Sequence, residues 1–443
     1  MRIYDNLERF AKDDPVRFFM PGHKGGKNLP ESYITPIMPY DVTELRKTDD
    51  LFSPESVIAD SQKKLAEIFG TTSAHYLAGG STLGLYGAIS MCVRPGSKVL
   101  LDRGCHRSVL DAMILLGAEP VFLDYKYEAS GVLSPVDAMD VYRALEVHPD
   151  VSAVVITSPT YYGLCSLIEP IHVITSAAGV PLIVDAAHGG NMLFLGLLPL
   201  CAEFTVISLH KTLPALTGAA VLFSNGYDAR MITRNLALFS TTSPSHVILA
   251  SAEKSITYMM GEGREALISL SEKCACFTSW LDMSTPFSHI EDAHSDITRI
   301  VIHTGETTMG GYELYNILED EFGIICEMAD DENVVLIPSI GNSDDDFERL
   351  CGALLSISKQ VKRKPASLEI KDSPKVVMGK SMREAFFSDK EYLSPDDSLG
   401  RIACESLMRY PPGIPYIIPG QLIGEHEISQ MKHLGVEKIL VIK

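Results

Sequence analysis

Between residues 55 and 225, short apolar stretches alternate with longer amphipathic ones, and this alternation limits the possible folds more than any other feature. The short stretches are apolar on both faces, as strands are when helices cover both sides of a parallel sheet. The stretches between them have the length of crossover helices. The sequence therefore predicts a doubly wound α/β domain, which binds ligands at the carboxyl ends of its strands. The predicted strands are Lys98–Asp102, Pro120–Asp124, Val151–Thr157, Val180–Asp185, Phe204–Leu209 and Ala219–Phe223, and the predicted helices include Arg107–Leu116, Pro135–Leu145 and Pro170–Ala178.

After about Trp280 the pattern changes to that of a smaller α/β module. Its predicted strands are Ser295–His303 and Val334–Pro338, and its predicted helices are Gly311–Phe322 and Asp345–Lys359. A basic linker follows, and then a part whose Pro/Gly cluster over residues 410–421 predicts a shaped loop. We therefore expect an N-terminal arm and active-site segment over residues 1–54, a large domain over 55–282, a small domain over 283–362 and a C-terminal domain over 363–443.

Composition excludes several classes of protein. The 443 residues include 38 Lys and Arg against 57 Asp and Glu, a net charge of −19, which argues against a nucleic-acid partner. The acidity could concentrate a cationic small substrate or could serve solubility alone. The longest apolar stretch, residues 192–202, contains a proline and is well short of the ~20 residues that span a bilayer, so we expect no membrane segment. The N-terminus lacks a secretory signal and the nine cysteines form no CxxC pair, which favours a cytoplasmic protein without disulfides or a metal site.

The strongest chemical signal is a pair of polar segments, 185–189 and 208–212, that each follow a predicted strand. Asp185 and Lys211 are one crossover unit apart, so their side chains can meet at adjacent strand ends. Such a pair could be a structural salt bridge. It could also hold pyridoxal phosphate (PLP), because a lysine amine forms a Schiff base with this cofactor and a carboxylate keeps its ring nitrogen protonated.

A plausible phosphate cradle precedes both segments. Residues 78–84 combine small residues, which expose backbone N–H groups, with the hydroxyls of Ser81 and Thr82. The amphipathic run that follows predicts a helix whose N-terminus faces the anion. The cradle alone is weak evidence, but the cradle, the aspartate and the lysine in this order are considerably stronger.

With these elements in place, the sequence resembles the Orn/Lys/Arg decarboxylases, which are PLP enzymes of fold type I that act on basic amino acids. The chain is similar to the short form of the family, without the N-terminal wing domain. The matching segments are 20–26, 41–44, 80–82, 105–108, 158–161, 185–189, 208–213, 241–245 and 410–419.

The resemblance implies a role for each residue of these motifs. Lys211 would form the Schiff base, Asp185 would pair with the ring nitrogen, His106 would stack on the ring and His188 would lie near the ring substituents; these four are the expected catalytic residues. The expected cofactor-binding residues are Gly80, Ser81, Thr82, His106, Asp185, His188, Ser208, His210, Lys211, Thr242 and Ser243. Thr242 and Ser243 match a segment that reaches the phosphate of the neighbouring subunit, which implies a homodimer with shared active sites.

The implied activity is decarboxylation of arginine, lysine or ornithine in polyamine metabolism, with no nucleic acid or membrane as partner. Four positions depart from the family pattern: Leu167, Ala186, Gly218 and Gln421. Since a buried cation needs an anionic partner, the carboxylates absent at 167 and 421 leave Asp41, Glu44, Asp49 and Asp50 as candidate partners. Transamination, elimination, or PLP binding in a degenerate pocket remain alternatives. The loop over 20–26 could bind an anion or shape a turn for the dimer.

Overall fold

The computed structural model describes residues 16–18, 24, 44, 48–124, 126–128, 130–290, 294–365, 376–408 and 413–443. Most of the motif over 20–26, Asp41 and residues 410–412 lie outside the described residues. Within that motif, Lys24 is buried, and its Nζ donates a hydrogen bond to the carbonyl of Ile337 at 2.9 Å. Lys24 thus contacts the segment predicted to form the small domain.

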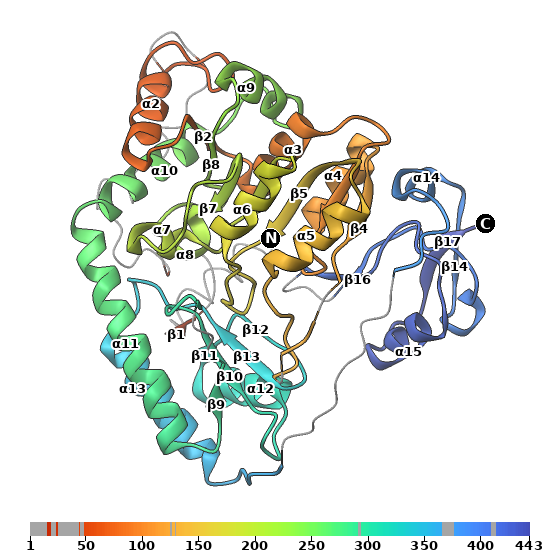
Figure 1. Ribbon diagram of the computed structural model, residues 1–443. Coiled ribbons are helices and arrows are strands. Elements are labelled where there is room, and N and C mark those ends of the chain that lie inside the picture. Colours follow the sequence, from red (N-terminus) through yellow and green to blue (C-terminus); the bar gives the residue numbers. More distant parts are fainter. Residues whose placement is uncertain are drawn as a thin grey trace, which may run out of the picture.

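A seven-stranded sheet forms the centre of the large domain (Figure 1). Its strand order is β2-β8-β7-β6-β5-β3-β4, and every strand except β8 runs in the same direction. The mainly parallel α/β fold is therefore confirmed. β8 is antiparallel because residues 209–219 are too few for a full crossover unit. The strands are β2 (Ser73–Leu77), β3 (Lys98–Leu101), β4 (Glu119–Phe122), β5 (Val151–Thr157), β6 (Leu182–Asp185), β7 (Phe204–Ser208) and β8 (Ala220–Ser224).

Helices cover both faces of this sheet, and alternate strand residues enter two separate cores. In β5, Val154 and Ile156 belong to one core, whereas Ala153 and Val155 belong to the other. This double burial explains why the strands are apolar on both faces. The helices of the domain are α2 (Val57–Phe69), α3 (Gly80–Cys92), α4 (Arg107–Leu116), α5 (Ala138–Val147), α6 (Ile168–Ala177), α7 (Gly190–Leu195), α8 (Leu209–Thr212), α9 (Ala229–Leu238) and α10 (His246–Met259).

The long helix α11 (Glu262–Ser284) leads into the small module, which has an antiparallel sheet of order β12-β13-β10-β9. Its strands are β9 (Ser288–His289), β10 (Ile300–His303), β12 (Met328–Ala329) and β13 (Asn333–Leu336), and its helices are α12 (Gly311–Phe322) and α13 (Asp344–Ser358). The short strand β1 (Val16–Arg17) pairs in parallel with β11 (Ile324–Ile325), so the N-terminal arm joins this module.

The C-terminal part has a small core of its own and lies on the side of α4 and α5 in Figure 1. Its elements are α14 (Met382–Phe387), β14 (Lys390–Leu393), the 3₁₀ helix η4 (Asp396–Ser398), β15 (Leu407–Met408), β16 (Pro415–Ile417), α15 (Glu425–His433) and β17 (Ile439–Ile442). The prediction of a loop throughout residues 410–421 is thus wrong for 415–417, which pair with β15 as an edge strand. The Arg103 guanidinium joins the two parts by donating to the carbonyls of Pro415 and Tyr416.

The domain boundaries at residues 54, 282 and 362 stay predictions. No described helix has both the length and the apolar composition needed to cross a bilayer.

Candidate active site

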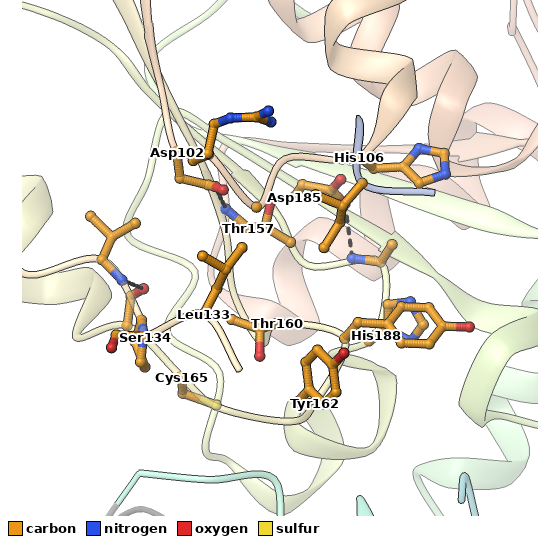
Figure 2. A pocket seen from close by; sticks show the side chains of 18 of the residues that line it. Asp102, His106, Leu133, Ser134, Thr157, Thr160, Tyr162, Cys165, Asp185 and His188 are labelled. Atoms are coloured by element: carbon orange, nitrogen blue, oxygen red, sulfur yellow. Dashed lines mark hydrogen bonds between the residues drawn. The ribbon is translucent and has the colours of Figure 1, made fainter. Parts of the chain in front are cut away.

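The carboxyl ends of β6 and β7 bring Asp185 and Lys211 to one cavity. Asp185 is the last residue of β6 and pairs in register with Val206 of the neighbouring strand β7. Lys211 follows β7 on the short helix α8. Both side chains line a cavity of about 570 Å³, and Figure 2 shows Asp185 there together with Asp102, His106 and His188. The predicted meeting of the two segments at the sheet edge is therefore confirmed.

The two residues do not form the salt bridge that was one interpretation of the pair. Lys211 Nζ lies 2.9 Å from His188 Nε2, and Asp185 Oδ1 accepts a hydrogen bond from the Ala187 amide at 3.1 Å. Among the residues that the structure describes, none forms an ion pair with Asp185. A buried carboxylate facing a cavity is thus left for a protonated group of a ligand.

Burial sets the protonation of both groups. The pKa of Lys211 is lowered to about 8, first by burial and also by the nearby Arg299 charge, whereas Asp185 and Glu327 oppose this change. Burial also raises the pKa of Asp185, against the attraction of Lys211. A lysine with a lowered pKa has a larger share of the neutral amine, the form that attacks an aldehyde.

The predicted cradle forms the first turn of α3, which begins at Gly80. Gly80 has a φ of +71° and its amide donates to the Gly218 carbonyl at 2.8 Å. Ser208 Oγ, at the end of β7, donates to Ser81 Oγ at 3.4 Å. Gly80, Ser81, Thr82 and Ser208 all line the cavity, so hydroxyls and a helix N-terminus face the same space as Lys211.

The three predicted site histidines also line the cavity. His106 is the N-cap of α4, where its Nδ1 accepts from the Ser108 amide at 3.2 Å, and burial with the Lys211 charge lowers its pKa to about 4. The ring of His188 meets the edge of Tyr161 at a centroid distance of 4.7 Å. His210 Nδ1 donates to the Ala219 carbonyl at 3.3 Å. His106 is therefore a neutral ring on the cavity wall, where it could stack on a cofactor ring.

Thr242 and Ser243 are exposed and do not line this cavity. Ser243 Oγ donates to Glu44 at 3.1 Å, so these two segments contact each other within the chain. The expectation that Thr242 and Ser243 serve the neighbouring subunit stays a prediction.

The structure shows the surroundings of two of the four positions that depart from the family pattern, Gly218 and Ala186. Gly218 has a φ of +94°, and a Cβ there would lie 3.2 Å from the Ala78 carbonyl oxygen, so the tight turn beside α3 favours glycine. Ala186 is buried in the core between β6 and α7.

The other two positions that depart from the family pattern, Leu167 and Gln421, differ in whether they line the cavity. Leu167 lines the cavity, but Gln421 does not: it is 2% exposed within the C-terminal part and donates to Glu427 at 3.0 Å. The expectation of a carboxylate missing from the pocket at 421 is therefore wrong for this cavity. Asp49, one of the candidate partners for a substrate cation, already has hydrogen-bond partners. Its carboxylate accepts from the amides of Glu55, Ser56 and Ile58 at the start of α2.

Two charged residues of this region were not predicted from the sequence. Asp102 follows β3 and lines the cavity, and Arg299 precedes β10 and contacts His188 from the small module. No described group of His, Cys, Asp and Glu side chains could hold a metal ion.

Comparison with known proteins decides the family. Residues 2–291 match the model of the Orn/Lys/Arg decarboxylase major domain, and residues 364–439 match that of the C-terminal domain. This chain belongs to the Orn/Lys/Arg decarboxylase family. It is a PLP-dependent amino acid decarboxylase.

Relatives resemble the chain over nearly its whole length. An arginine decarboxylase of Halalkalibacterium halodurans is 28% identical over 97% of this chain and 92% of its own, and one of Bacillus subtilis is 28% identical over 96% and 92%. The solved structure of lysine decarboxylase A from Pseudomonas aeruginosa matches 97% of this chain and 78% of its own, with a TM-score of 0.76 and 18% identity. Serine palmitoyltransferase of Sphingomonas wittichii shares the fold over 68% of this chain and 76% of its own, with a TM-score of 0.56 and 18% identity.

The side chains of the cavity fit PLP. The amine of Lys211 can hold its aldehyde carbon, and the carboxylate of Asp185, which has no ion-pair partner among the described residues, can accept a hydrogen bond from its protonated ring nitrogen. The first turn of α3 offers amides and hydroxyls to its phosphate. The cavity therefore supplies groups for the aldehyde, the ring nitrogen and the phosphate of this family's cofactor.

Proposed function

We propose that this decarboxylase acts on arginine, lysine or ornithine, with arginine as the first candidate, and that its amine product enters polyamine metabolism. The observation that carries the proposal is the convergence of Lys211, Asp185 and the first turn of α3 on one cavity. Arginine comes first because the relatives of similar length are named arginine decarboxylases, whereas this chain covers 74% of the constitutive lysine decarboxylase of Escherichia coli.

Each residue would have a distinct task. Lys211 would hold PLP covalently, leave it when the substrate amine binds and return when the product departs. Asp185 would keep a proton on the ring nitrogen, and His106 would fix the plane of the ring from the cavity wall. PLP, when bound, takes up the electron pair that remains on the α-carbon after carbon dioxide leaves. The walls of the cavity would hold the carboxylate perpendicular to the ring, since orientation decides which bond breaks.

The distal cation of the substrate would face the acidic wall formed by the segment after β4 and the start of α5. Four carboxylates line the cavity there, but Asp140 pairs with Lys126 and Arg143, and Asp137 caps α5. The carboxylates left for a cation are those of the exposed residues Asp124 and Glu128. A guanidinium or ammonium group that contacts these two carboxylates would remain in contact with solvent, so it would not need a buried anionic partner. The absence of a carboxylate at Leu167 is therefore compatible with a cationic substrate.

The decisive experiment incubates the PLP-loaded protein with each of the three amino acids and measures carbon dioxide and the matching amine. We expect equal amounts of both from at least one substrate, and none from the Lys211→Ala control. A keto acid without carbon dioxide would mean transamination, loss of a side-chain fragment would mean elimination, and intact substrate despite a spectral change would mean a degenerate pocket. Any of these outcomes would overturn the proposal.

A homodimer with shared sites is part of the same proposal. It is supported by the exposure of Thr242 and Ser243, which the cavity of their own chain does not use. Sedimentation of the wild-type protein and mixing of Lys211→Ala with a Ser243→Ala variant would test it. If the sites are shared, a mixed dimer contains one site with both Lys211 and Ser243, and we expect that site to bind PLP as tightly as the wild-type protein does. If the mixture binds PLP no better than the two variants do separately, the sites are not shared.

A further inference from the structure

Arg299 extends from the small module to the site lysine through one histidine. Arg299 is 5% exposed, and its Nη1 donates to the Tyr161 carbonyl at 3.1 Å. Nη2 lies 3.1 Å from His188 Nδ1, and the opposite ring nitrogen of His188 lies 2.9 Å from Lys211 Nζ. Arg299 does not line the cavity, so it lies behind His188 as seen from the cofactor space.

The chemistry of these groups fixes the direction of both hydrogen bonds. A guanidinium has donors only and keeps its charge, so His188 Nδ1 must accept from Arg299. A neutral imidazole that accepts at Nδ1 carries its proton on Nε2. The Nε2–H then donates to Lys211 Nζ, and Nζ can accept only as an unprotonated amine. The contact between Arg299 and His188 thus selects the reactive form of Lys211.

The charges around the two groups agree with this arrangement. Burial lowers the pKa of His188 well below its usual value, and the charge that Lys211 carries when it is protonated and the charge of Arg299 act in the same direction, so the ring stays neutral in both states of the lysine. The Arg299 charge also lowers the pKa of Lys211. The titratable groups that face the pair from neighbouring elements are Asp185 and Glu327, which favour the charged lysine, and His106 and His210, which favour a neutral His188.

We propose that Arg299 is a positioning residue that holds His188 in its Nε2–H tautomer and thereby increases the share of Lys211 present as the neutral amine, the form that condenses with PLP. The proposal rests on the proposed role of Lys211 as the residue that holds the cofactor. The alternative is that Arg299 only fastens the small module to the large domain.

The test measures how fast cofactor-free protein captures PLP at different pH values. The visible absorbance that appears on mixing gives the rate, and the midpoint of its pH profile reports the protonation of the amine. Borohydride reduction and mass analysis of the labelled peptide show separately whether Lys211 holds PLP. A label elsewhere would refute the role of Lys211, whereas the midpoint tests Arg299.

Three variants distinguish a role of Arg299 in positioning His188 from a role in attaching the small module to the large domain. Arg299→Met loses the donor and the charge, and should move the midpoint up from near pH 8 by about one pH unit, which slows capture at pH 7 about tenfold. Arg299→Lys keeps a charged donor and should restore most of the rate. Asn191→Ala removes a different buried bond across the same junction, from Asn191 Nδ2 to Thr298 Oγ1, and should leave the midpoint unchanged.

Two results would overturn the proposal. One is an unchanged midpoint in Arg299→Met with the label still on Lys211, and the other is an equal shift in Asn191→Ala. If Arg299→Met does not fold, Arg299→Gln decides instead. Gln loses the charge, and its amide can accept as well as donate, so it no longer forces His188 Nδ1 to accept. Its midpoint must therefore also rise, and an unchanged midpoint in Arg299→Gln refutes the proposal as well.

Discussion

Replacing Asp102 by asparagine should stabilise this protein above neutral pH. Asp102 lies at the end of β3, is 6% exposed and accepts from the Thr157 amide through Oδ2 at 2.5 Å. Burial raises the pKa of its carboxyl from 3.8 to about 7, and the negative charge of Asp185 adds to this change, while hydrogen bonds from Thr157 and Gly104 oppose it. The folded protein therefore binds this proton more tightly than the unfolded chain does.

The size and the sign of the effect follow from that difference. Below about pH 4 the carboxyl is protonated in both states, and stability is unaffected by its ionisation. As the pH rises from 4 to 7, the unfolded chain releases the proton first, so stability falls. Because a tenfold change in proton affinity corresponds to about 1.4 kcal/mol, the full loss is at most about 4 kcal/mol. Asparagine cannot ionise, yet it keeps an oxygen for the Thr157 amide.

The assay is urea unfolding of cofactor-free Asp102→Asn and wild-type protein at pH 5 and pH 8. We expect a gain in the free energy of unfolding of a few kcal/mol at pH 8 and a much smaller gain at pH 5. Equal destabilisation at both pH values would refute the reasoning, since it would mean that the carboxylate is needed as an anion.

Asp49 provides a matched control of opposite sign. Burial alone would raise the pKa of its carboxyl, but backbone amides that include those of Glu55 and Ser56 donate to it and hold the pKa well below its usual value. Its stabilisation is present above the ordinary pKa and is lost as the pH falls. Asp49→Asn should therefore destabilise the protein by about 1–2 kcal/mol at pH 8, the range of a lost helix cap.

Three further substitutions test the assigned site. Lys211→Ala should abolish the visible absorbance of bound PLP and all turnover while the circular dichroism is unchanged, and covalently held PLP in this variant would mean that another lysine binds it. Asp185→Asn should still bind PLP but lose about 10²–10³ in kcat, because the ring nitrogen would no longer be held protonated; near-normal turnover would contradict that role. Gly218→Ala should weaken PLP binding roughly tenfold in an equilibrium titration, since its φ of +94° strains an L-residue and shifts the carbonyl that holds Gly80; unchanged affinity would argue against the cradle.

The elements that the sequence predicted well are those whose hydrophobic pattern decides their structure. β5 and α4 coincide with the predicted ranges because one is apolar on both faces and the other is capped by His106 and ended by Gly117. β2 was missed because its buried residues include polar ones. The side chains of His75 and Ser73 form a hydrogen bond of 3.1 Å, so both polar groups can be buried. The periodicity of apolar residues in a sequence does not indicate such a pair.

The same distinction holds for the site. Lys211 and Asp185 could be found because each follows a recognisable strand within a motif. Arg299 belongs to another module, and only the folded chain brings it to His188. Asp102 was within a predicted strand, but its raised pKa depends on its burial in the folded chain and, to a smaller extent, on Asp185 at the end of another strand. Such properties arise from contacts between distant segments, which single-sequence patterns do not contain.

The site owes its protonation states to burial between two modules rather than to the net charge of the protein. Burial favours the neutral forms of Lys211, His188 and Asp102 alike, so it removes both positive and negative charge from the cavity. Arg299 keeps its charge through this change, and it comes from the small module. Any separation of the small module from the sheet would hydrate Lys211 and withdraw Arg299 together, and both effects would return the lysine to its unreactive ammonium form. If Arg299 has the proposed role, the reactivity of Lys211 depends on the docking of the two modules.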